Sequence, residues 1–450
     1  MSVETDKPGG WTIITLGDIV EKVAIKVNPI DNPNAKFIGM DCIQPNAMKP
    51  HFHYTFGNFK SSGNWFKKNQ VLYGRMRPYL NKVFKATYDG ACSGEFIILD
   101  GQGLINPDLL TFMIHHRDFV QFANKKTSGD RPRISFDEIS NYPIKLPPLP
   151  EQQRIVAKIE ELFSSLDKGI ESLKTVQQQL KVYRQAVLKW AFEGRLTHEN
   201  VKDGELPEGW RWVHVNDIIK KEKNSLKAGP FGSSLKKDVY VQYGYKVYGQ
   251  EQVIKGDYTY GDYFIDEEKY EELKSCKVEH GDVLISLVGT VGKVLVLPEN
   301  SLPGIINPRL IKVSLDKQKY MAIFFKYYFE SAKVKNYYSV EAQGTTMDVL
   351  NLNIIKTIPF PLMSINEQSQ IVSEIESRLS VCDKIEEAIT QCLQQAEALR
   401  QSILKKAFEG KLVPQDPSDE PAGVLLERIR QKSGNLTPSS GKKKTNGKPH

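Results

Sequence analysis

Two long stretches of this sequence repeat each other. Residues 151–196, which begin EQQRIVAKIEELFSSLD and end AFEGRL, align without a gap with residues 367–412, which begin EQSQIVSEIESRLSVCD and end AFEGKL. About 20 of the aligned positions are identical, which chance does not produce. A shorter match pairs PGGWTIITLGDIV near the N-terminus with PEGWRWVHVNDII from Pro207 onward. The chain is therefore a duplication, with the order head, helix, head, helix.

Apolar residues in each copy recur every three or four positions, the spacing of one helix face. Pro150 suits a first turn, Ser364 and Glu367 form a capping-box pattern, and Gly194 and Gly410 fit C-terminal caps. Each copy predicts one helix of about 40 residues, which needs a partner for its apolar stripe. The residues predicted to pair the helices are Ile155, Ile159, Leu162, Leu166, Leu173, Leu180, Ile371, Ile375, Leu379, Ile389, Leu399 and Ile403.

The helix pairing restricts the fold. An antiparallel pair lets the segment between the helices close locally at one end, whereas a parallel pair would make its connections cross the whole helix length. We predict an α+β chain with a pseudo-twofold internal repeat, in which two mixed α/β heads are separated by two long helices that form an antiparallel coiled coil. The predicted ranges are 1–143 for the first head, 144–197 and 359–413 for the helical regions, 198–358 for the second head, and 414–450 for a basic, disordered tail.

The composition favours a cytoplasmic protein. No apolar run approaches the about 18 to 20 residues of a membrane helix, and MSVETDKPGG lacks the apolar centre of a signal peptide. The five cysteines show neither CxxC spacing nor clustering with histidine, so we expect small core residues rather than disulfides or a zinc site. The net charge of +7 is weak evidence for nucleic acid, because five lysines and no acid lie in the last 20 residues.

Basic, aromatic and small polar residues gather in turn-like segments of both heads. Arginine and lysine contact phosphate, and arginine also binds guanine through two hydrogen bonds. Such clusters are more often solvated surface, and GPFG is compatible with a turn whose Phe231 is either a core anchor or an inserted wedge. The predicted DNA-binding residues are Lys67, Lys68, Arg75, Arg77, Tyr79, Lys82, Arg131 and Arg133 in the first head, and Lys227, Phe231, Ser233, Ser234, Lys236, Lys237, Lys293, Arg309, Thr345 and Thr346 in the second.

Catalytic motifs are mostly missing. The chain has no glycine-rich dinucleotide fingerprint, and LPPLP lacks the polar and aromatic members of a base-holding motif. The stretch VGTVGK is shorter than a P-loop and is followed by Val294, so a β-turn is favoured. His115 and His116 are adjacent and diverge on a helix, which argues against a metal pair. We predict no catalytic residue, no metal site and no cofactor bound by this chain.

Several motifs resemble the DNA-specificity subunit of type I restriction-modification systems. They are PLPEQQRIVAKIEELFSSLD, AFEGRL, RPYLNK, GPFGSSL and GDVLIS, within a similarity that runs from Trp11 to Leu412. The start of the second helix, LMSINEQSQIV, departs from the pattern because it lacks the Pro-Leu-Pro approach.

The resemblance implies two target-recognition domains, each reading one half of an interrupted site in double-stranded DNA. It also implies two modification subunits on the helices, which bind S-adenosylmethionine and methylate adenine at N6, and restriction subunits that use ATP and Mg. The chain would then be the non-catalytic part of that complex, without membrane contact or homo-oligomerisation. Two alternatives stay open: a coiled-coil adaptor with two protein-binding heads, and a self-contained methyltransferase, against which the missing motifs argue.

Overall fold

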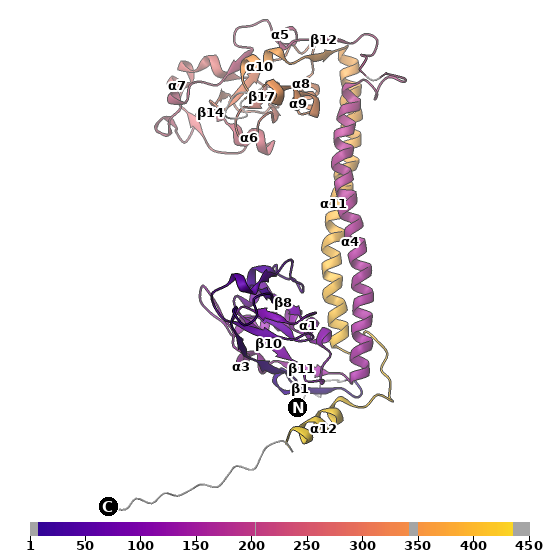
Figure 1. Ribbon diagram of the computed structural model, residues 1–450. Coiled ribbons are helices and arrows are strands. Elements are labelled where there is room, and N and C mark those ends of the chain that lie inside the picture. Colours follow the sequence, from indigo (N-terminus) through magenta and orange to yellow (C-terminus); the bar gives the residue numbers. More distant parts are fainter. Residues whose placement is uncertain (1–7, 203, 342–349, 435–450) are drawn as a thin grey trace, which may run out of the picture. The chain divides into compact units, whose positions relative to one another are not determined.

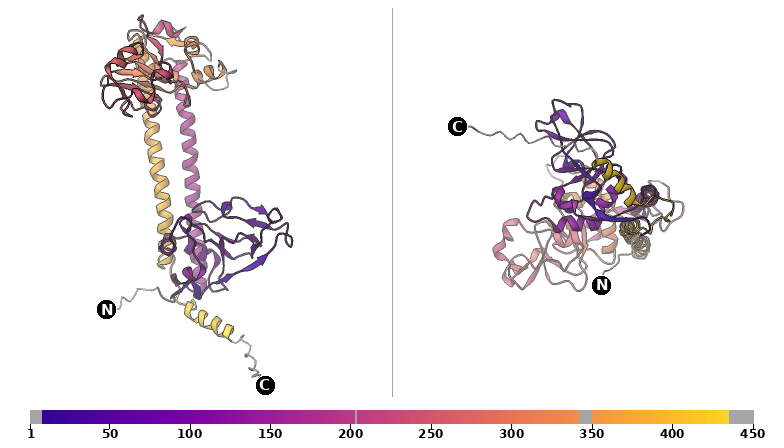
Figure 2. Two further views of the ribbon diagram at one scale, coloured as in Figure 1. Left: turned by 90° about the vertical axis from the view of Figure 1, so that its left-hand side faces the viewer. Right: turned by 90° about the horizontal axis from the view of Figure 1, so that it is seen from below.

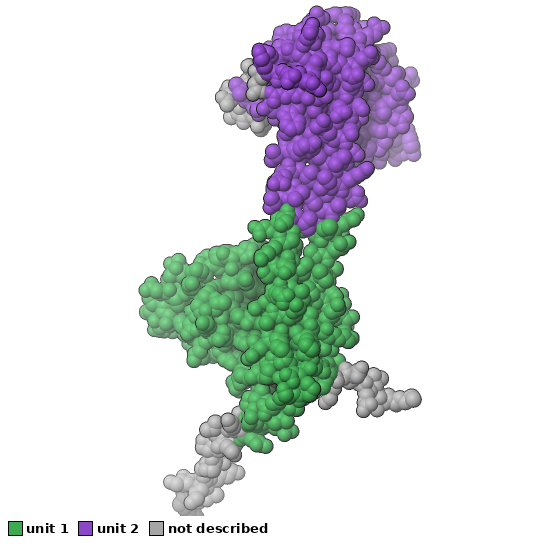
Figure 3. All heavy atoms as spheres, turned by 90° about the vertical axis from the view of Figure 1, so that its right-hand side faces the viewer, with its two compact units in different colours: residues 1–172, 391–450 green, residues 173–390 purple. Residues whose placement is uncertain are grey.

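The computed structural model describes residues 8–202, 204–341 and 350–434 (Figure 1). The chain divides into two compact units, coloured separately in Figure 3. Unit 1 comprises residues up to 172 together with those from 391 onward, and unit 2 comprises residues 173–390. Both divisions fall inside the long helices α4 (Leu149–Phe192) and α11 (Ile365–Phe408), so each unit contains one head and parts of both helices.

The two long helices have 44 residues each and run antiparallel, as predicted. In unit 1, Asp167 on the first half of α4 forms an ion pair with Arg400 near the end of α11. In unit 2, Arg184 on the second half of α4 contacts Asp383 on the first half of α11 at 2.6 Å. Asp167 aligns with Asp383 in the repeat, and Arg184 aligns with Arg400. The duplication therefore forms the same ion pair twice, and Figures 1 and 2 show the helices side by side.

Eleven of the twelve residues predicted to pair the helices are buried or half-buried, whereas the side chain of Leu399 is 48% exposed. The neighbouring Arg400 faces α4 instead: besides its ion pair, its guanidinium lies 5.0 Å from the centre of the Phe163 ring. Cys392 is also exposed, contrary to the expectation of a core residue, whereas Cys42, Cys92, Cys276 and Cys382 are buried. An arginine thus continues the inward face of α11 where the sequence pattern suggested leucine.

Each long helix begins inside the core of a head. Ile155 and Ile159 pack into the apolar cluster of head 1, and Ile371 and Ile375 pack into that of head 2. These four residues therefore join a helix to a head, a role that the periodicity alone does not distinguish from helix pairing.

A tryptophan locks the first turn of each helix onto its head. Trp11 Nε1 donates to the Glu151 carboxylate at 2.9 Å, and Trp210 Nε1 donates to the Glu367 carboxylate at 2.7 Å. Ser364 Oγ accepts from the Glu367 backbone N–H at 3.2 Å, which is one half of the predicted capping box. No return bond from Ser364 N–H to the Glu367 carboxylate is formed among the described residues, because that carboxylate serves Trp210.

A buried glutamine repeats the same lock one residue later. Gln152 accepts from the Asn106 N–H at 2.7 Å and donates to the carbonyl oxygens of Leu104 and Pro147. Gln368 makes the equivalent three bonds, accepting from the Met321 N–H and donating to the carbonyl oxygens of Lys319 and Met363. Both side chains are fully buried, so every one of these bonds satisfies a backbone group that water cannot reach.

The predicted helix ends are confirmed. Gly194 and Gly410 directly follow the last turns and adopt left-handed φ values of 78° and 69°. A side chain at either position would collide with a proline of the head frame, Pro207 for Gly194 and Pro8 for Gly410. Glycine is required there for both conformation and space.

The described residues of head 1 form three sheets. A two-stranded sheet joins its two ends through β1 (Thr12–Thr15) and β11 (Pro143–Leu146). The four-stranded sheet has the order β2-β10-β7-β8, and the five-stranded sheet has the order β3-β6-β9-β4-β5. Their bounds are β2 (Glu21–Val23), β3 (Ile25–Val27), β4 (Lys36–Ile38), β5 (Tyr54–Thr55), β6 (Gly63–Phe66), β7 (Val71–Gly74), β8 (Val83–Lys85), β9 (Gly90–Cys92) and β10 (Phe96–Asp100).

Head 2 repeats this plan with a shorter third sheet. The ends meet through β12 (Arg211–Val213) and β21 (Phe360–Leu362), and the two further sheets have the orders β13-β20-β17-β18 and β15-β14-β19-β16. Their bounds are β13 (Leu226–Ala228), β14 (Tyr245–Tyr248), β15 (Phe264–Ile265), β16 (Lys277–Val278), β17 (Val283–Ser286), β18 (Val294–Val296), β19 (Gly304–Ile306) and β20 (Leu310–Val313). The stretches SGEFIIL, GDVLISLVG and GKVLVLP combine β-branched residues with glycine at a boundary, which predicts strands, and the structure forms β10, β17 and β18 there.

The segments PDLLTFMIHHRDFVQFA in head 1 and KYMAIFFKYYFESAKV in head 2 have a helical apolar pattern, and the structure divides each of them into two helices. In head 1 the break is at His116, which caps the second helix through its imidazole, and in head 2 it is at Glu330 and Ser331. The short helices are α1 (Pro107–His115), α2 (Arg117–Lys125) and α3 (Phe136–Ser140) in head 1, and α5 (Val215–Ile218), α6 (Gln250–Lys255), α7 (Glu267–Glu272), α8 (Ala322–Phe329), α9 (Ala332–Glu341) and α10 (Leu352–Thr357) in head 2.

The predicted disordered tail starts too early. Helix α12 (Ala422–Gly434) follows the second long helix and packs on head 1, with Ala422 and Leu426 buried in its core cluster. The Ala422 N–H donates to the Gly10 carbonyl, and Arg154 on α4 forms an ion pair with Asp419 at 2.6 Å. The prediction of disorder relied on the lysine-rich composition of the tail and overlooked the few apolar residues of α12. The predicted disorder of residues 435–450 lies outside the described part of the chain.

Within residues 8–202, 204–341 and 350–434, every helix is too short or too polar to span a membrane.

Candidate nucleic-acid interface

The connection between β7 and β8 carries the predicted basic segment of head 1. Residues 78–80 form a short 3-10 helix, η4 (Pro78–Leu80), and the residues on either side of it, Arg77 and Asn81, have left-handed φ values of 53° and 46°. The Gly74 N–H donates to the Lys82 carbonyl at 2.9 Å, which closes the turn at its base.

The structure brings the segment GDRPRIS, which carries the predicted Arg131 and Arg133, against this turn. Met76 pairs with Arg133 in an isolated β-bridge, and the Arg77 N–H donates to the Pro132 carbonyl at 2.8 Å. The Ile134 N–H donates to the Arg75 carbonyl at 3.0 Å. Two stretches that are about 55 residues apart in the sequence thus form one surface with Arg75, Arg77, Arg131 and Arg133 on its strands and turns, which we call the head 1 turn surface.

Two of the predicted DNA-binding cations are committed to bonds within head 1. Lys82 Nζ donates to the Met40 carbonyl at 2.7 Å, and burial lowers the pKa of this lysine, although Asp41 opposes that shift. Arg133 binds the Glu95 carboxylate through Nε and Nη2, with a shortest distance of 2.9 Å. These contacts hold the turn in place, so Lys82 and Arg133 are poorly suited to bind phosphate.

Other cations of this surface form no ion pair among the described residues. They include Arg77 and Arg131, while Lys67 and Lys68 are exposed in the turn before β7. The Nε atoms of Arg75 and Arg77 are buried without a hydrogen-bond acceptor in the described part of the chain. Tyr79, at the centre of the 3-10 helix, is 51% exposed. An anionic or base-edge acceptor is the kind of ligand that would satisfy such a set of donors.

Lys22 and Lys26 were missed by sequence reasoning. Together with Arg75 and Asn64 they line a hollow of about 240 Å³ beside β2 and β6, and the Asn64 Oδ1 is buried without a partner among the described residues. The two lysines are exposed on the edge strand segment EKVAIKV. Two lysines within one strand-like stretch form a pattern from which a basic surface could have been predicted.

Head 2 presents its predicted residues around the β17–β18 connection. The Leu287 N–H donates to the Arg309 carbonyl at 3.0 Å, the Gly229 N–H donates to the Leu310 carbonyl, and Gln250 Nε2 donates to the Val288 carbonyl. The stretch VGTVGK is this connection, as the β-turn interpretation predicted, and Lys293 is exposed in it. These bonds bring GPFG, Arg309 and the hairpin together, although Gln250 had not been predicted from the sequence.

Phe231 is 87% exposed, which excludes the core-anchor interpretation and leaves the wedge as a prediction. Lys236 and Lys237 follow it on the surface, with Ser233 and Ser234 in η5 (Gly232–Ser234) and Lys227 half-buried in β13. The predicted Thr345 and Thr346 lie outside the described residues.

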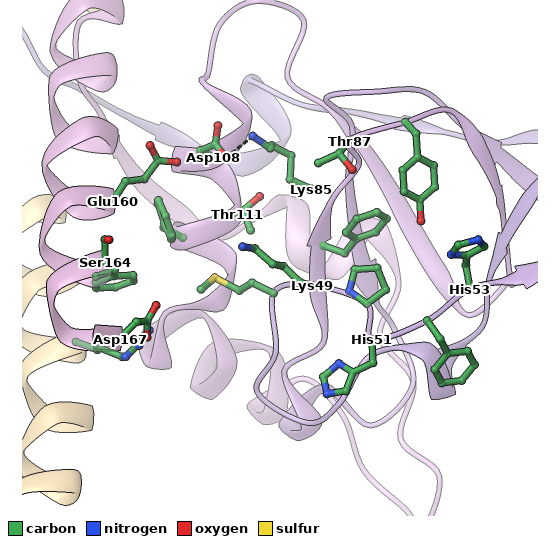
Figure 4. A pocket seen from close by; sticks show the side chains of 18 of the residues that line it. Lys49, His51, His53, Lys85, Thr87, Asp108, Thr111, Glu160, Ser164 and Asp167 are labelled. Atoms are coloured by element: carbon green, nitrogen blue, oxygen red, sulfur yellow. Dashed lines mark hydrogen bonds and ion pairs between the residues drawn. The ribbon is translucent and has the colours of Figure 1, made fainter. Parts of the chain in front are cut away.

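A separate groove of about 850 Å³ in unit 1 has a different chemistry (Figure 4). Glu160, Ser164 and Asp167 on α4 face a loop that carries Lys49, His51 and His53. Lys85 and Asp108 form an ion pair of 2.5 Å within it. Because the helix side places Glu160 and Glu171 beside the paired Asp167 and Arg400, its charges are mixed, and the groove is less suited to a phosphate backbone than the head 1 turn surface.

No group of three or more histidine, cysteine, aspartate or glutamate residues that could hold a metal ion occurs in the described ranges. His115 Nε2 lies 3.0 Å from the Asn46 carbonyl oxygen, and the His116 imidazole accepts from the Asp118 N–H. The two rings therefore serve different backbone groups.

A family model named "Type I restriction modification DNA specificity domain" matches residues 8–181 and 207–395. The chain belongs to this family. The two matches, one for each head with its following helix, agree with the internal repeat and with the predicted resemblance, and a specificity domain is a recognition module rather than a catalytic one.

A curated relative agrees with this assignment, and two solved structures share the fold. The EcoBI specificity subunit of Escherichia coli is 29% identical over 68% of this chain and 66% of its own length, so the match spans just under two thirds of that relative. A structure described as showing complex assembly and conformational transition of the type I R-M system has a TM-score of 0.73 over 90% of this chain and all of the other, at 20% identity. The HsdS subunit from Thermoanaerobacter tengcongensis has a TM-score of 0.59 at 22% identity, covering 91% and 99% of the two chains.

Proposed function

We propose that this chain is the DNA-reading subunit of a type I restriction-modification complex, in which each head recognises one half of a bipartite, asymmetric site in double-stranded DNA. The observation that supports the proposal is that the two heads share one fold but carry different side chains on the equivalent surface turn. The strand orders and the helix junctions repeat, whereas the connection between the paired hairpin strands carries Arg75 and Arg77 in head 1 and Leu287 and Gly289 in head 2. Two related frames with unlike surfaces suit two unlike half-sites.

The long helices are the proposed docking site for two modification subunits that bind S-adenosylmethionine and methylate adenine at N6. Restriction subunits that use ATP and Mg²⁺ would join the same complex, in the cytoplasm, while this chain binds no cofactor and stays single within the complex. Support comes from the family and from the exposed outer faces of both helices, which the ion pairs between them leave uncovered.

Single-molecule sequencing of the host genome, with and without this gene, tests the proposal. We expect one bipartite motif with N6-methyladenine on both strands to disappear when the gene is deleted and to return when it is restored. A methylation pattern that is unchanged by the deletion contradicts the proposal.

A binding assay separates the proposal from an adaptor without a nucleic-acid role. The purified chain, with its modification subunits, should retain the bipartite DNA over competitor DNA, and its affinity should fall steeply as salt rises. An adaptor would show neither the preference nor the salt dependence. Methyl transfer by the isolated chain would instead support a self-contained methyltransferase.

A further inference from the structure

Arg77 occupies a backbone conformation that its residue type disfavours. Its φ and ψ are 53° and 68°, in the left-handed region where a Cβ crowds the following carbonyl oxygen. The next residue is Pro78, which further restricts the residue before it toward extended conformations. A non-glycine residue held in this way costs conformational free energy, and such positions concentrate at functional sites.

Head 2 shows the less strained solution for the same turn. Gly74 N–H to Lys82 carbonyl closes the turn of head 1, and Ser286 N–H to Lys293 carbonyl closes that of head 2. The third residue after each opening position is Arg77 in head 1 and Gly289 in head 2, and Gly289 has a φ of 72°. The residue before each closing lysine is also left-handed in both heads, Asn81 in head 1 and Gly292 in head 2. The same left-handed backbone position is therefore occupied by Gly289 in head 2 and by Arg77 in head 1.

The frame of head 1 holds this turn firmly without using the Arg77 side chain. The backbone of Arg77 is fixed by the Pro132 carbonyl and by the Leu80 N–H, and the Leu80 carbonyl accepts from the Asn46 N–H at 2.8 Å. Asn81 Nδ2 donates to the His115 carbonyl at 2.9 Å. The Arg77 guanidinium forms no hydrogen bond or ion pair with the described residues, so the fold gains little from it that glycine would not provide.

We infer that Arg77 is a specificity-determining residue of head 1, which reads guanine in the major groove from a turn that is kept strained to present it. The inference rests on the proposed function and deepens it. A guanidinium matches the O6 and N7 acceptors of guanine with two hydrogen bonds. The exposed Tyr79 lies two residues further along the same turn, where it can contact the neighbouring base or sugar.

The test replaces Arg77 in the chromosomal gene and sequences the methylated genome. Arg77→Gly removes the side chain and the strain together, so the complex should melt at the same temperature or higher while discrimination at one guanine of one half-site falls about tenfold to a hundredfold. The other half-site should stay unchanged. Arg77→Lys keeps the positive charge but loses the paired hydrogen bonds, so it should retain binding and lose discrimination at the same base.

Gln102→Gly is the matched control. Gln102 is also left-handed, with a φ of 50°, and is exposed in head 1 in the loop after β10. This variant relieves the same kind of backbone strain, and it also removes the 2.6 Å bond from Gln102 Nε2 to the Glu21 carboxylate; it should leave the methylated motif as it was.

Three outcomes overturn the inference. An unchanged motif in Arg77→Gly means that the side chain does not read a base. A uniform loss of affinity over all sequences, restored by Arg77→Lys, means that it contacts phosphate. A lower melting temperature with both half-sites affected means that its role is structural. Failure of the proposed function is distinguishable, because the parent gene would then direct no bipartite motif at all.

Discussion

The junctions between head and helix are nearly identical in the two units, whereas the hairpin turns of the two heads share only their backbone geometry. Trp11 with Gln152 and Trp210 with Gln368 make the same set of bonds to equivalent groups. The turns keep two left-handed positions but fill the first with Arg77 in head 1 and with Gly289 in head 2. Buried bonds tolerate little change, since a lost partner leaves a desolvated polar group, while an exposed turn can vary its side chains freely.

The same contrast appears inside the sheets. Lys312 in β20 is buried near Asp282, and its Nζ donates to the Lys277 carbonyl at 2.8 Å. The corresponding residue of β10 in head 1, by strand register, is the buried Ile98. The two heads thus differ at a buried position where the side chain and its bonding partner can change together. Gln152 and Gln368 cannot change in this way, because each bonds three backbone groups, which nearly every residue type shares.

The largest expected effect is the loss of those glutamines. Gln152→Ala and Gln368→Ala each leave one N–H and two carbonyl groups without partners in the core, which should cost about 2 to 4 kcal/mol of the free energy of unfolding of the affected unit. Hydrogen exchange locates the effect, because the Asn106 amide should lose protection in the first variant and the Met321 amide in the second.

The neighbouring exposed glutamines Gln153 and Gln370 provide matched controls, and their alanine variants should change stability by less than about 0.5 kcal/mol. Equal effects of Gln152→Ala and Gln153→Ala would show that the buried bonds do not hold the junction.

A smaller effect should separate the two junction carboxylates. Glu367 Oε1 accepts from Trp210, lies 2.6 Å from His198 Nε2 and receives a third contact from Thr197 at 3.4 Å. Glu151 is bonded only by Trp11 among the described residues, and its Oε1 is buried without a partner. Glu367→Gln should therefore destabilise unit 2 by about 1 to 2 kcal/mol, whereas Glu151→Gln should leave unit 1 unchanged or more stable at neutral pH.

The pH dependence gives the sign. Burial raises the pKa of Glu151, while the bond from Trp11 opposes this shift. The folded state then binds this proton more tightly than the unfolded state, so the contribution of Glu151 to stability is present below the ordinary carboxyl pKa and is lost as pH rises through the folded-state pKa. In urea titrations of the full chain from pH 4 upward, the free energy of unfolding of unit 1 should fall as pH rises in the parent protein. The same plot should be flatter for Glu151→Gln. A steeper profile in the variant would contradict the assignment.

The repeat made much of this fold predictable. Because two copies of about 46 residues shared one helical spacing, the long helices, their caps at Gly194 and Gly410 and their antiparallel pairing followed from the sequence. Strand segments such as β10 and β17 were also predictable. Runs of β-branched and aromatic residues bounded by glycine favour strands, and the same apolar side chains are the ones that the fold buries.

Contacts between distant residues were not predictable from local patterns. The pairing of Arg133 with Glu95 and the bond from Lys82 to the Met40 carbonyl join positions 38 and 42 residues apart, and neither leaves a signal in the sequence. The equivalence of Arg77 and Gly289 could not be found from the sequence, because the two turns share only their closing lysine, differ in length and correspond through strand register. The role of Arg77 in the β7–β8 turn can therefore be inferred from its backbone φ and ψ angles but not from the sequence.

The smallest expected effect concerns the repeated ion pair between the helices. Asp383 is largely exposed and Arg184 is partly exposed, so the pair should contribute about 0.5 to 1 kcal/mol of coupling free energy. Arg400 should cost more to remove than Arg184, since its guanidinium also packs on the Phe163 ring. Double-mutant cycles with Arg184→Ala and Asp383→Asn, and with Arg400→Ala and Asp167→Asn, measure both couplings by urea unfolding at low and high salt.

The two cycles should also differ in their response to salt. Charge attraction between exposed groups is screened, so the Arg184 coupling should shrink toward zero at about 1 M salt. Most of the cost of Arg400→Ala should persist there, because contact with an aromatic ring depends less on ionic strength than a surface ion pair does. Equal costs and equal salt dependence at both positions would mean that the two halves of the coiled coil are held in the same way, and that the duplicated helices have diverged less than the heads they carry.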